Sequence, residues 1–560
     1  MNRRLILILG WWAAVLLGAA ADLAWHYPQL PASMAVHFDA AGVPDRWSPK
    51  SEFLTTWILM TLLLGAQSGV LCAASDRDRV RSYAMPREVK DPAPAALVPA
   101  PAAMVAQATD ADEDLPLGRD ELFGTIGDDP SPASGSGDTP TAAPGDIPTP
   151  APGARQLLAI RGFVDFAPAY AYESPGHWAR GVVRTQLETR ASLGASAKWK
   201  ASVRLDVDPV YYATDFYPDE VKKDQRLDLQ VRETYLDLTL PRNWELRLGR
   251  QHVVWGEAVA LFFADVVSAR DLRDYILPEF EILRIPQWAA RAEYFGERMH
   301  LELLWVPFPT YDDIGEPGAE FYPYHPGEVA GFDTVLRGDQ RPANTLSNTS
   351  YGARMSGLIS GWDLSAFFYR SHSVSSTLYR ELVTTPVPTI VYQPRHDRIW
   401  QLGGTLAKDF GSVVLKSEAV YTHGRHYEVS DLASSTGTVK QNTLDYLLGL
   451  DFILPMDGRL NVQGFQRIYF DHDDDILFDQ FETGFSVLVS GKVRPKLEPQ
   501  LLYIQSLNSN DRLLRPRINW YARPDLRISV GVDIFAGPNT GAFGTFGDSD
   551  RVYAELRYTF

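Results

Sequence analysis

The chain has 560 residues, of which 22% are charged and 12% aromatic, and its formal net charge is −17. This negative charge argues against a nucleic-acid-binding protein, because phosphates require a basic protein surface. The single cysteine, Cys72, excludes an intrachain disulfide and a thiolate metal cluster.

Two apolar stretches lie in the first segment, residues 1–84, at positions 5–21 and 53–74. Each is close to the roughly 20 residues that a membrane helix requires. The first stretch is also typical of a signal peptide, because Arg3 and Arg4 precede it and three alanines end it. We therefore expect two apolar helices joined by a short loop.

The loop between the two stretches, residues 26–50, contains His37-Phe38 among several prolines, then a glycine, and ends on a lysine. This order of residues resembles the small membrane domain of unknown function 1648. The resemblance is confined to the first segment and implies that it is associated with a membrane.

The second segment, residues 85–155, is rich in proline, alanine, aspartate and glycine. It lacks the apolar residues that a packed core requires, so we expect a disordered linker. At ~3.1 Å for each residue, such a linker reaches about 200 Å when fully extended.

The third segment, residues 156–560, ends in a stretch of strict alternation at 551–560. Leu556, Tyr558 and Phe560 lie on its apolar side, as in a strand with one face against an apolar phase. A terminal phenylalanine at that parity resembles the C-terminal recognition strand of bacterial outer-membrane β-barrels. The resemblance implies that these three residues form an assembly signal for the barrel assembly machinery. It also implies contact with outer-membrane lipids and lipopolysaccharide, which the negative charge suits.

Similar alternation recurs throughout this segment. Candidate strands begin near residues 157, 180, 197, 226, 243, 287, 299, 348, 361, 397, 412, 442, 459, 480, 494, 513, 525 and 549. Tight turns and longer connections alternate between them, which is the pattern of short periplasmic turns and long outer loops. The prediction is an all-β fold, a transmembrane antiparallel β-barrel of about 18 strands with 16 as the alternative. Polar residues of the opposite parity are expected to line a wet lumen.

The N-terminal segment conflicts with this prediction. Basic residues stand before the first apolar stretch and after the second, which predicts both ends of the pair in the cytoplasm. The barrel could not then reach an outer membrane. Three explanations are open: the first stretch is a cleaved signal, translation starts at Met85 with cleavage after Ala108, or the chain joins two genes. We favour a gene fusion or a start-site anomaly over a tether that spans the envelope.

The most distinctive motif is 246–257, LRLGRQHVVWGE. Gly249 and Arg250 interrupt its alternation, which predicts a β-bulge. With the later Ile285-Pro286, the motif resembles the outer-membrane family of unknown function 1302, over about residues 156–560, and more distantly alginate-export and other porin-like barrels. The resemblance implies a protein that works beside an inner-membrane exporter of hydrophobic or lipid-like compounds.

Two interpretations of this motif are open. In the favoured structural one, Arg250 and Glu257 pair and fold the following loop into the barrel mouth. In the functional one, the loop 255–286 forms a short helix that constricts the lumen and places charges where solutes pass. The candidate residues of the mouth or constriction are Arg247, Arg250, Gln251, Trp255, Gly256, Glu257, Asp265, Arg270 and Arg273.

Motifs for catalysis are missing: there is no Gly-x-Ser-x-Gly, no His-Glu-x-x-His and no phosphate-binding Gly-Lys-Ser/Thr. We therefore expect neither an enzyme nor a bound cofactor. The acidic run 471–475 and the pair His423 and His426 are interpreted as solvated loop residues rather than metal ligands.

The arginines of the last strands leave two hypotheses open, a basic ladder for anions on the lumen wall or a mixed-charge lumen. They are Arg515, Arg517, Arg523 and Arg527. The predicted function is an outer-membrane channel that passes or exports a solute, with hydrophobic or lipid-like cargo favoured. The alternative is a passive porin for small hydrophilic solutes, and a surface-structural protein is the third hypothesis. The predicted location is the outer membrane of a Gram-negative-type cell, with the N-terminal helices cleaved or in the inner membrane.

Overall fold

The computed structural model describes residues 33–38, 44–49 and 160–560, apart from 195, 257, 259, 260, 326–328, 330, 385 and 433. The first unit, Met1–Pro92, contributes an antiparallel hairpin of β1 (Ser33–Phe38) and β2 (Pro44–Pro49). Among the described residues, no helix has both the length and the apolar character to cross a membrane. The expected N-terminal helices, their cleavage and the linker lie outside the described residues.

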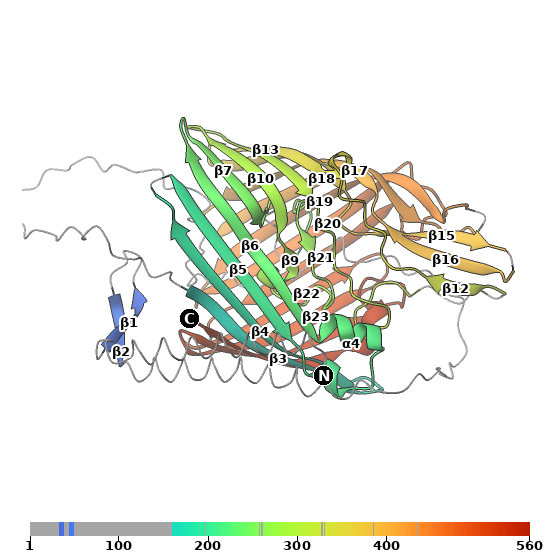
Figure 1. The fold of residues 1–560 in the computed structure, drawn as a ribbon, viewed down its shortest axis with the longest axis horizontal. Coiled ribbons are helices and arrows are strands. Elements are labelled where there is room, and N and C mark those ends of the chain that lie inside the picture. The colour runs from blue at the N-terminus through green and yellow to red at the C-terminus, as the bar shows by residue number, and fades with distance from the viewer. Residues whose placement is uncertain are drawn as a thin grey trace, which may run out of the picture. The chain divides into compact units, whose positions relative to one another are not determined.

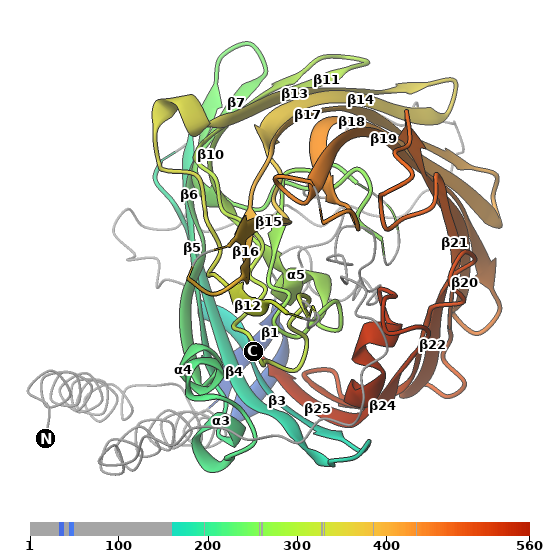
Figure 2. The same cartoon turned by 90° about the vertical axis from the view of Figure 1, so that its right-hand side faces the viewer.

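The second unit, Ala93–Phe560, contains a closed barrel of 18 antiparallel strands (Figures 1 and 2). The barrel strands are β3 (Ile160–Ala171), β4 (His177–Ser192), β5 (Ala197–Val207), β6 (Leu227–Leu240), β7 (Trp244–Gln251), β10 (Gln287–Phe295), β11 (His300–Phe308), β13 (Ser350–Ile359), β14 (Trp362–His372), β17 (Arg398–Asp409), β18 (Val413–Glu428), β19 (Thr438–Leu454), β20 (Gly458–Phe470), β21 (Phe481–Ser490), β22 (Leu497–Ser506), β23 (Arg512–Arg523), β24 (Leu526–Ala536) and β25 (Arg551–Thr559).

The predicted barrel and its strand number are confirmed. The largest difference between expected and observed strand starts is four residues, at β19, which was expected near 442 and begins at Thr438. The ring closes where β25 pairs with β3. At this seam the backbone N–H groups of Gly162 and Phe560 each donate to the carbonyl of the other residue, both at 2.9 Å.

The long connections lie at one end of the barrel and contain the remaining elements. A three-stranded sheet of β12 (Asp333–Leu336), β16 (Thr389–Arg395) and β15 (Thr377–Val383) projects from that end (Figure 1). The helical elements of these connections are α3 (Val210–Ala213), α4 (Asp219–Gln225), α5 (Phe280–Leu283), η4 (Leu346–Asn348) and η5 (Gly544–Ser549). The opposite end has tight turns, such as Ser360-Gly361 between β13 and β14, where both residues have positive φ.

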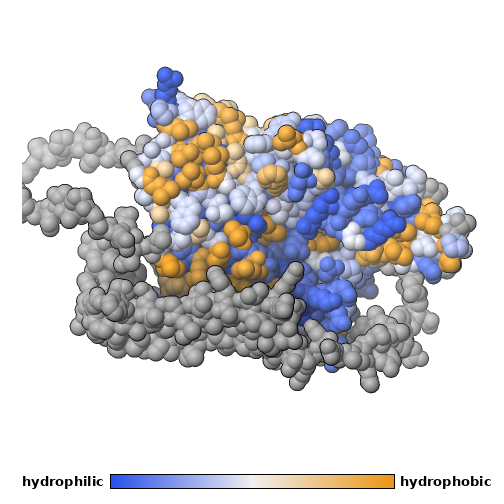
Figure 3. All heavy atoms as spheres, in the orientation of Figure 1, coloured by the Kyte–Doolittle hydropathy of each residue, from blue (hydrophilic) through white to orange (hydrophobic). Residues whose placement is uncertain are grey.

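The outer face of the barrel is apolar. Trp305, Leu448 and Val530 illustrate the outward parity, and their side chains remain exposed. Figure 3 shows apolar residues gathered over the visible part of the wall. Because exposed apolar surface of this extent is stable only against a nonpolar phase, the wall is suited to hydrocarbon.

The side chains that face the lumen are less polar than the sequence predicts. Arg204, Ser486 and Asp533 face inward as expected and are buried. On β19 to β24, however, several apolar side chains share the inward parity and form part of a buried cluster: Leu447, Phe465, Leu488, Leu502, Ile504, Leu513 and Phe535. The expectation of a uniformly wet lumen is therefore wrong on this side of the barrel.

Candidate functional site

The most unusual connection of the barrel is residues 252–286, which we call the lumen loop. β7 pairs with β6 only as far as Arg250 opposite Thr234, and it ends at Gln251. β6 continues beyond this point to Leu227, with β5 as its only partner strand among the described residues. The chain after Gln251 turns inward instead of extending the wall, and it rejoins the wall at the start of β10.

Inside the barrel the lumen loop is mostly irregular. Its regular pieces are a short pairing of β8 (Ala269–Arg270) with β9 (Arg284–Ile285) and the single turn α5, which Figure 2 shows within the ring of strands. The short helix of the functional hypothesis for 255–286 corresponds to α5, near the end of the loop. Earlier in the loop, a wall side chain satisfies the backbone instead: Glu418 of β18 accepts from the N–H groups of Ala258 (2.7 Å) and Ala264 (2.8 Å).

The predicted bulge at Gly249-Arg250 is also wrong. β7 keeps a continuous register with both β6 and β10 through these residues. Gly249 has a φ of +134°, and a Cβ there would lie 2.2 Å from the carbonyl oxygen of Thr234. The glycine is therefore required by backbone conformation and close approach. The extra residue lies in β6 instead, opposite β5, where the register shifts between Ala201 and Val203.

One side of the lumen loop packs on the apolar wall of β19 to β24. Phe263 lies against Phe465 of β20, with ring centroids 5.9 Å apart. The buried loop members of this cluster are Leu261, Phe262, Phe263, Leu272, Tyr275, Ile276, Leu277 and Leu283. Burial of this many apolar side chains is a strong driving force for holding the loop inside the barrel.

A second apolar cluster anchors the beginning of the loop on β10 to β18. Trp255 is 1% exposed and packs against Phe367 and Tyr369 of β14. Its indole Nε1–H donates to Glu302 Oε1 of β11 at 2.9 Å. Gln251, which is fully buried, donates through Nε2 to the carbonyl of Ala289 at 3.1 Å. The distinctive sequence motif is thus an anchor for the loop.

The other side of the lumen loop is held by arginines of the barrel wall. Arg232 of β6 donates to the backbone carbonyls of Glu281 and Arg284. Arg204 of β5 donates to the carbonyl of Ile282 at 3.0 Å. These contacts fix the loop backbone, not only its side chains.

Three arginines on neighbouring strands converge on one loop carboxylate, that of Glu279. Arg527 of β24 and Arg557 of β25 form short ion pairs with it. The nearest guanidinium nitrogen of Arg517 of β23 lies 4.0 Å away. Arg515, also on β23, donates to the carbonyl of Leu277 at 3.2 Å.

The charges around the loop carboxyls stabilise their ionised forms. Burial by itself would raise the pKa of Asp271, Asp274 and Glu279. The arginines that contact these groups outweigh burial and hold the pKa of all three below the usual range. The loop therefore stays negatively charged, and stays attracted to the wall, at neutral pH.

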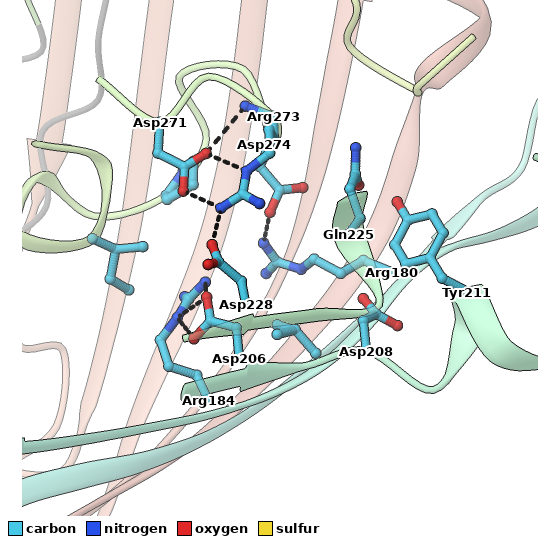
Figure 4. A pocket seen from close by; sticks show the side chains of 13 residues that line it. Arg180, Arg184, Asp206, Asp208, Tyr211, Gln225, Asp228, Asp271, Arg273 and Asp274 are labelled. Atoms are coloured by element: carbon cyan, nitrogen blue, oxygen red, sulfur yellow. Dashed lines mark hydrogen bonds and ion pairs between the residues drawn. The ribbon is translucent and has the colours of Figure 1, made fainter. Parts of the chain in front are cut away.

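Little space remains between the loop and the wall of β4 to β6. Figure 4 shows a cavity there, of about 50 Å³, which is room for on the order of a few waters. Arg273 of the loop bridges Asp228 of β6 (2.5 Å) and Asp271 (2.7 Å), and Arg180 of β4 pairs with Asp274. The lining is ionic and internally paired.

These contacts place the lumen loop across the whole lumen. In the order of strands around the ring, β6 and β20 are nine places apart in either direction, so they lie on opposite walls. Arg232 holds the loop on β6, and Phe465 contacts it on β20. The loop therefore bridges opposite sides of the barrel.

The structure brings most of the predicted site residues into this bridge. Asp265 pairs with Arg284 at 2.7 Å, and Arg270 pairs with Asp312 at 2.9 Å. At Gly256 a Cβ would lie 2.8 Å from the backbone nitrogen of residue 265, so the chain is tightly packed there. These residues organise the loop.

Other predicted residues lie apart from the loop. Arg247 pairs with Asp237 on the wall at 2.5 Å. Arg250 has the outward parity of Leu248, and its proposed partner Glu257 lies outside the described residues. The pairing of Arg250 with Glu257 stays a prediction.

Two contributors to the site were missed or misplaced by sequence reasoning. Glu279 carried no local signal, since it is one of two acids, with Glu281, in an otherwise largely apolar stretch. Of the predicted arginine ladder, Arg515, Arg517 and Arg527 are buried on the lumen side, but Arg523 is exposed beside a turn and pairs with Asp525. The prediction of an arginine ladder is therefore wrong for Arg523, because this residue lies too close to the end of the barrel.

A closed antiparallel barrel with an apolar outer wall and a largely polar lumen defines a transmembrane β-barrel of the outer-membrane type. The family model described as protein of unknown function (DUF1302) matches residues 172–560, more than half of the chain, and the protein belongs to this family. The model described as domain of unknown function (DUF1648) matches residues 6–63. Comparison with curated proteins gave no match.

Solved outer-membrane barrels are similar in structure at low sequence identity. OccK8 (OprE) of Pseudomonas aeruginosa has a TM-score of 0.43 at 9% identity, over 72% of this chain and 98% of that one. The channel DcaP of Acinetobacter baumannii has a TM-score of 0.36 at 12% identity, over 72% and 97%. OmpF of Salmonella typhi, solved as a complex with daunomycin, has a TM-score of 0.35 at 9% identity, over 72% and 97%.

Proposed function

We propose that the protein is an outer-membrane channel in which the lumen loop controls the passage of a solute. The observation that carries this proposal is the bridge from Arg232 on β6 to Phe465 on β20. A loop anchored on opposite walls crosses the path along the barrel axis, and we infer that a large solute passes only when the loop moves.

Hydrophobic or lipid-like cargo is favoured by the apolar lumen wall. If the loop leaves its site, the inward side chains of β19 to β24, including Leu488, Leu502 and Leu513, become available to a passing molecule. A pore for water-soluble solutes alone has no need for such a surface. A partnership with an inner-membrane exporter is part of the proposal and would deliver such cargo to the periplasmic end.

A passive porin for small hydrophilic solutes is the second candidate. It is supported by the paired charges on the rest of the wall, such as Arg184 with Asp206 at 2.9 Å. A mixed-charge lining suits hydrated solutes of either sign.

Conductance of the purified full chain in planar bilayers tests the proposal. Deletion of residues 258–275 is expected to raise single-channel conductance several-fold over the wild type, because it removes the bridge. Deletion of residues 384–388, the connection between β15 and β16, is the control and should leave conductance unchanged. Equal conductance of the 258–275 deletion and the wild type would refute gating by the loop. Rapid swelling in small sugars of liposomes that contain the wild-type protein would favour the passive porin.

A further inference from the structure

Glu279 occupies a charged site that belongs to the barrel wall. Arg527 and Arg557 stand directly opposite each other on β24 and β25, and Arg517 is on the next strand, β23. Like charges in cross-strand positions repel unless an anion lies between them. Two acids of the wall pair with these arginines: Glu555 lies 2.8 Å from Arg527, and Asp165 lies 2.6 Å from Arg557. Three positive and two negative wall groups leave one positive charge, which Glu279 neutralises.

The site has hydrogen-bonding capacity that Glu279 does not use. Arg517 is 6% exposed, and its Nε and Nη2 atoms have no hydrogen-bond partner among the described residues. The Glu279 carboxylate stays 4.0 Å from this guanidinium. Unsatisfied buried donors are costly, so an anion that reaches all three arginines would bind more favourably than Glu279 does.

An apolar surface lies farther along the same strands, beyond the pair of Arg515 and Asp533, which are 2.6 Å apart. Ile276 and Leu277, directly before Pro278 and Glu279, are buried in the cluster that contains Leu513 of β23 and Phe535 of β24. The segment 276–279 therefore places apolar side chains in this cluster and a carboxylate on the arginines farther along the wall. This is the arrangement of an amphipathic acid lying along β23 to β25.

We propose that this wall is a binding site for an amphipathic anion, a carboxylate or phosphate with an apolar tail, and that the segment 276–279 occupies it in the closed channel. The inference rests on the proposed function, because it makes the loop a competitor that the cargo displaces. Anionic headgroups bind to Arg517, Arg527 and Arg557, and the tail replaces Ile276 and Leu277.

Opening of the channel by octanoate in planar bilayers tests the site in the full-length protein, because an anion that displaces the segment 276–279 releases the loop. Glu279→Gln removes the competing charge and is expected to lower the octanoate concentration for half-maximal opening about tenfold. Adding Arg517→Gln to that variant should reverse the gain. Arg467→Gln is the matched control, because Arg467 is a buried lumen arginine on β20 that pairs with Asp445 instead of the loop. Octyl phosphate distinguishes a phosphate preference from a carboxylate preference.

Several outcomes would overturn the inference. Equal opening by octanoate, octanol and octyltrimethylammonium would show that the head charge is irrelevant. No effect of Arg517→Gln, alone or with Glu279→Gln, in protein that keeps the electrophoretic mobility of a folded barrel, would show that the arginines do not bind the probe. If the 258–275 deletion raises conductance but opening by octanoate is unselective, the gating function stands and only the anion site fails. If that deletion leaves conductance unchanged, the gating function itself fails.

Discussion

Phe263 in the lumen loop and Phe465 on β20 face each other with ring centroids 5.9 Å apart and ring planes 49° apart. This contact lies on the wall opposite Arg232, whose guanidinium holds the carbonyls of Glu281 and Arg284. An apolar contact at one end and hydrogen bonds at the other brace the loop across the lumen. Opening therefore requires the loss of at least one of the two.

The first prediction concerns the apolar end of the brace. Phe263→Ala removes a buried ring, and such changes typically cost about 3–5 kcal/mol. We expect faster hydrogen–deuterium exchange of residues 252–286 and a larger open fraction in bilayers. Phe368→Ala on β14 is the control, since that ring is 40% exposed on the outer face. Equal exchange in the two variants would contradict the packing role of Phe263.

The polar end supports a second prediction. Arg232→Gln loses two charge-assisted hydrogen bonds, each worth about 1.5–3 kcal/mol. Loop exchange should increase as it does in Phe263→Ala. Because Arg232 and Phe263 act on opposite walls and share no partner, their effects on the free energy of one concerted release should add in the double variant. A double variant no different from either single variant would contradict a loop held at both ends. Arg161→Gln, at an exposed position on β3, is the control.

Gly249 leads to a third prediction, about the start of the loop. Gly249→Ala would force a methyl group to 2.2 Å from the carbonyl oxygen of Thr234 at a positive φ, so β6 and β7 must separate locally. We expect a lower midpoint for thermal loss of the folded barrel band on electrophoresis. Gly464→Ala on β20 is a matched control, because a Cβ there has no atom within 4 Å. An unchanged midpoint for Gly249→Ala would rule out this steric role.

The barrel could be predicted from sequence because its signal is local. Alternation such as that of Leu526, Ile528 and Val530 against Arg527 and Ser529 follows from the two-residue period of a strand between two phases. Turn length alternates along the whole segment because successive connections lie at opposite ends of the barrel, and only one end carries long loops. Each strand can therefore be recognised from its own residues, without knowledge of its neighbours in the sheet.

The site could not be predicted in the same way, because its contacts are distant in the chain. Glu279 and Arg557 are 278 residues apart, and only barrel closure brings them together. The inward apolar residues also could not be recognised from the sequence. Phe465 and Phe535 stand at the parity that elsewhere carries polar side chains, and the lumen loop that packs in the same cluster is distant from both in the chain.

The ionised carboxyls of the loop lead to a fourth prediction, on pH. The pKa of Asp271, Asp274 and Glu279 is lower in the docked loop than in the released loop. Their contribution to the stability of the docked loop is therefore fully present above the usual pKa near ~4, and it is lost as pH falls through the lower pKa values of the docked loop. Conductance, corrected for buffer, should therefore be the same at pH 7.5 and pH 5, and should rise only well below ~4. Opening between pH 7.5 and pH 5 would refute ion pairing as the clamp.

Other acids near the barrel mouth respond in the opposite sense. Burial raises the pKa of Asp208, and of Asp224 in α4, to about 6. The pKa of both groups is higher in the docked connection than in the released one. Burial of the ionised carboxylates therefore destabilises the docked connection above pH 6. Protonation removes this cost as pH falls toward the usual pKa near ~4. Mild acid is thus expected to tighten the connection 208–226. Its hydrogen–deuterium exchange, corrected for intrinsic rate, should be slower at pH 5 than at pH 7.5, and faster exchange would contradict this sign.

The last prediction separates two roles of Phe560. Its backbone closes the ring through two hydrogen bonds with Gly162, and its ring stacks on Tyr558 at the outward parity. Phe560→Ala keeps the backbone bonds, so refolding of the purified protein in detergent should be close to normal. If the ring is the assembly signal, the same variant should give several-fold less folded barrel in cells, whereas Phe560→Trp should give wild-type levels. Equal loss in detergent and in cells would instead assign the ring a role in stability, since the assembly machinery is absent from detergent.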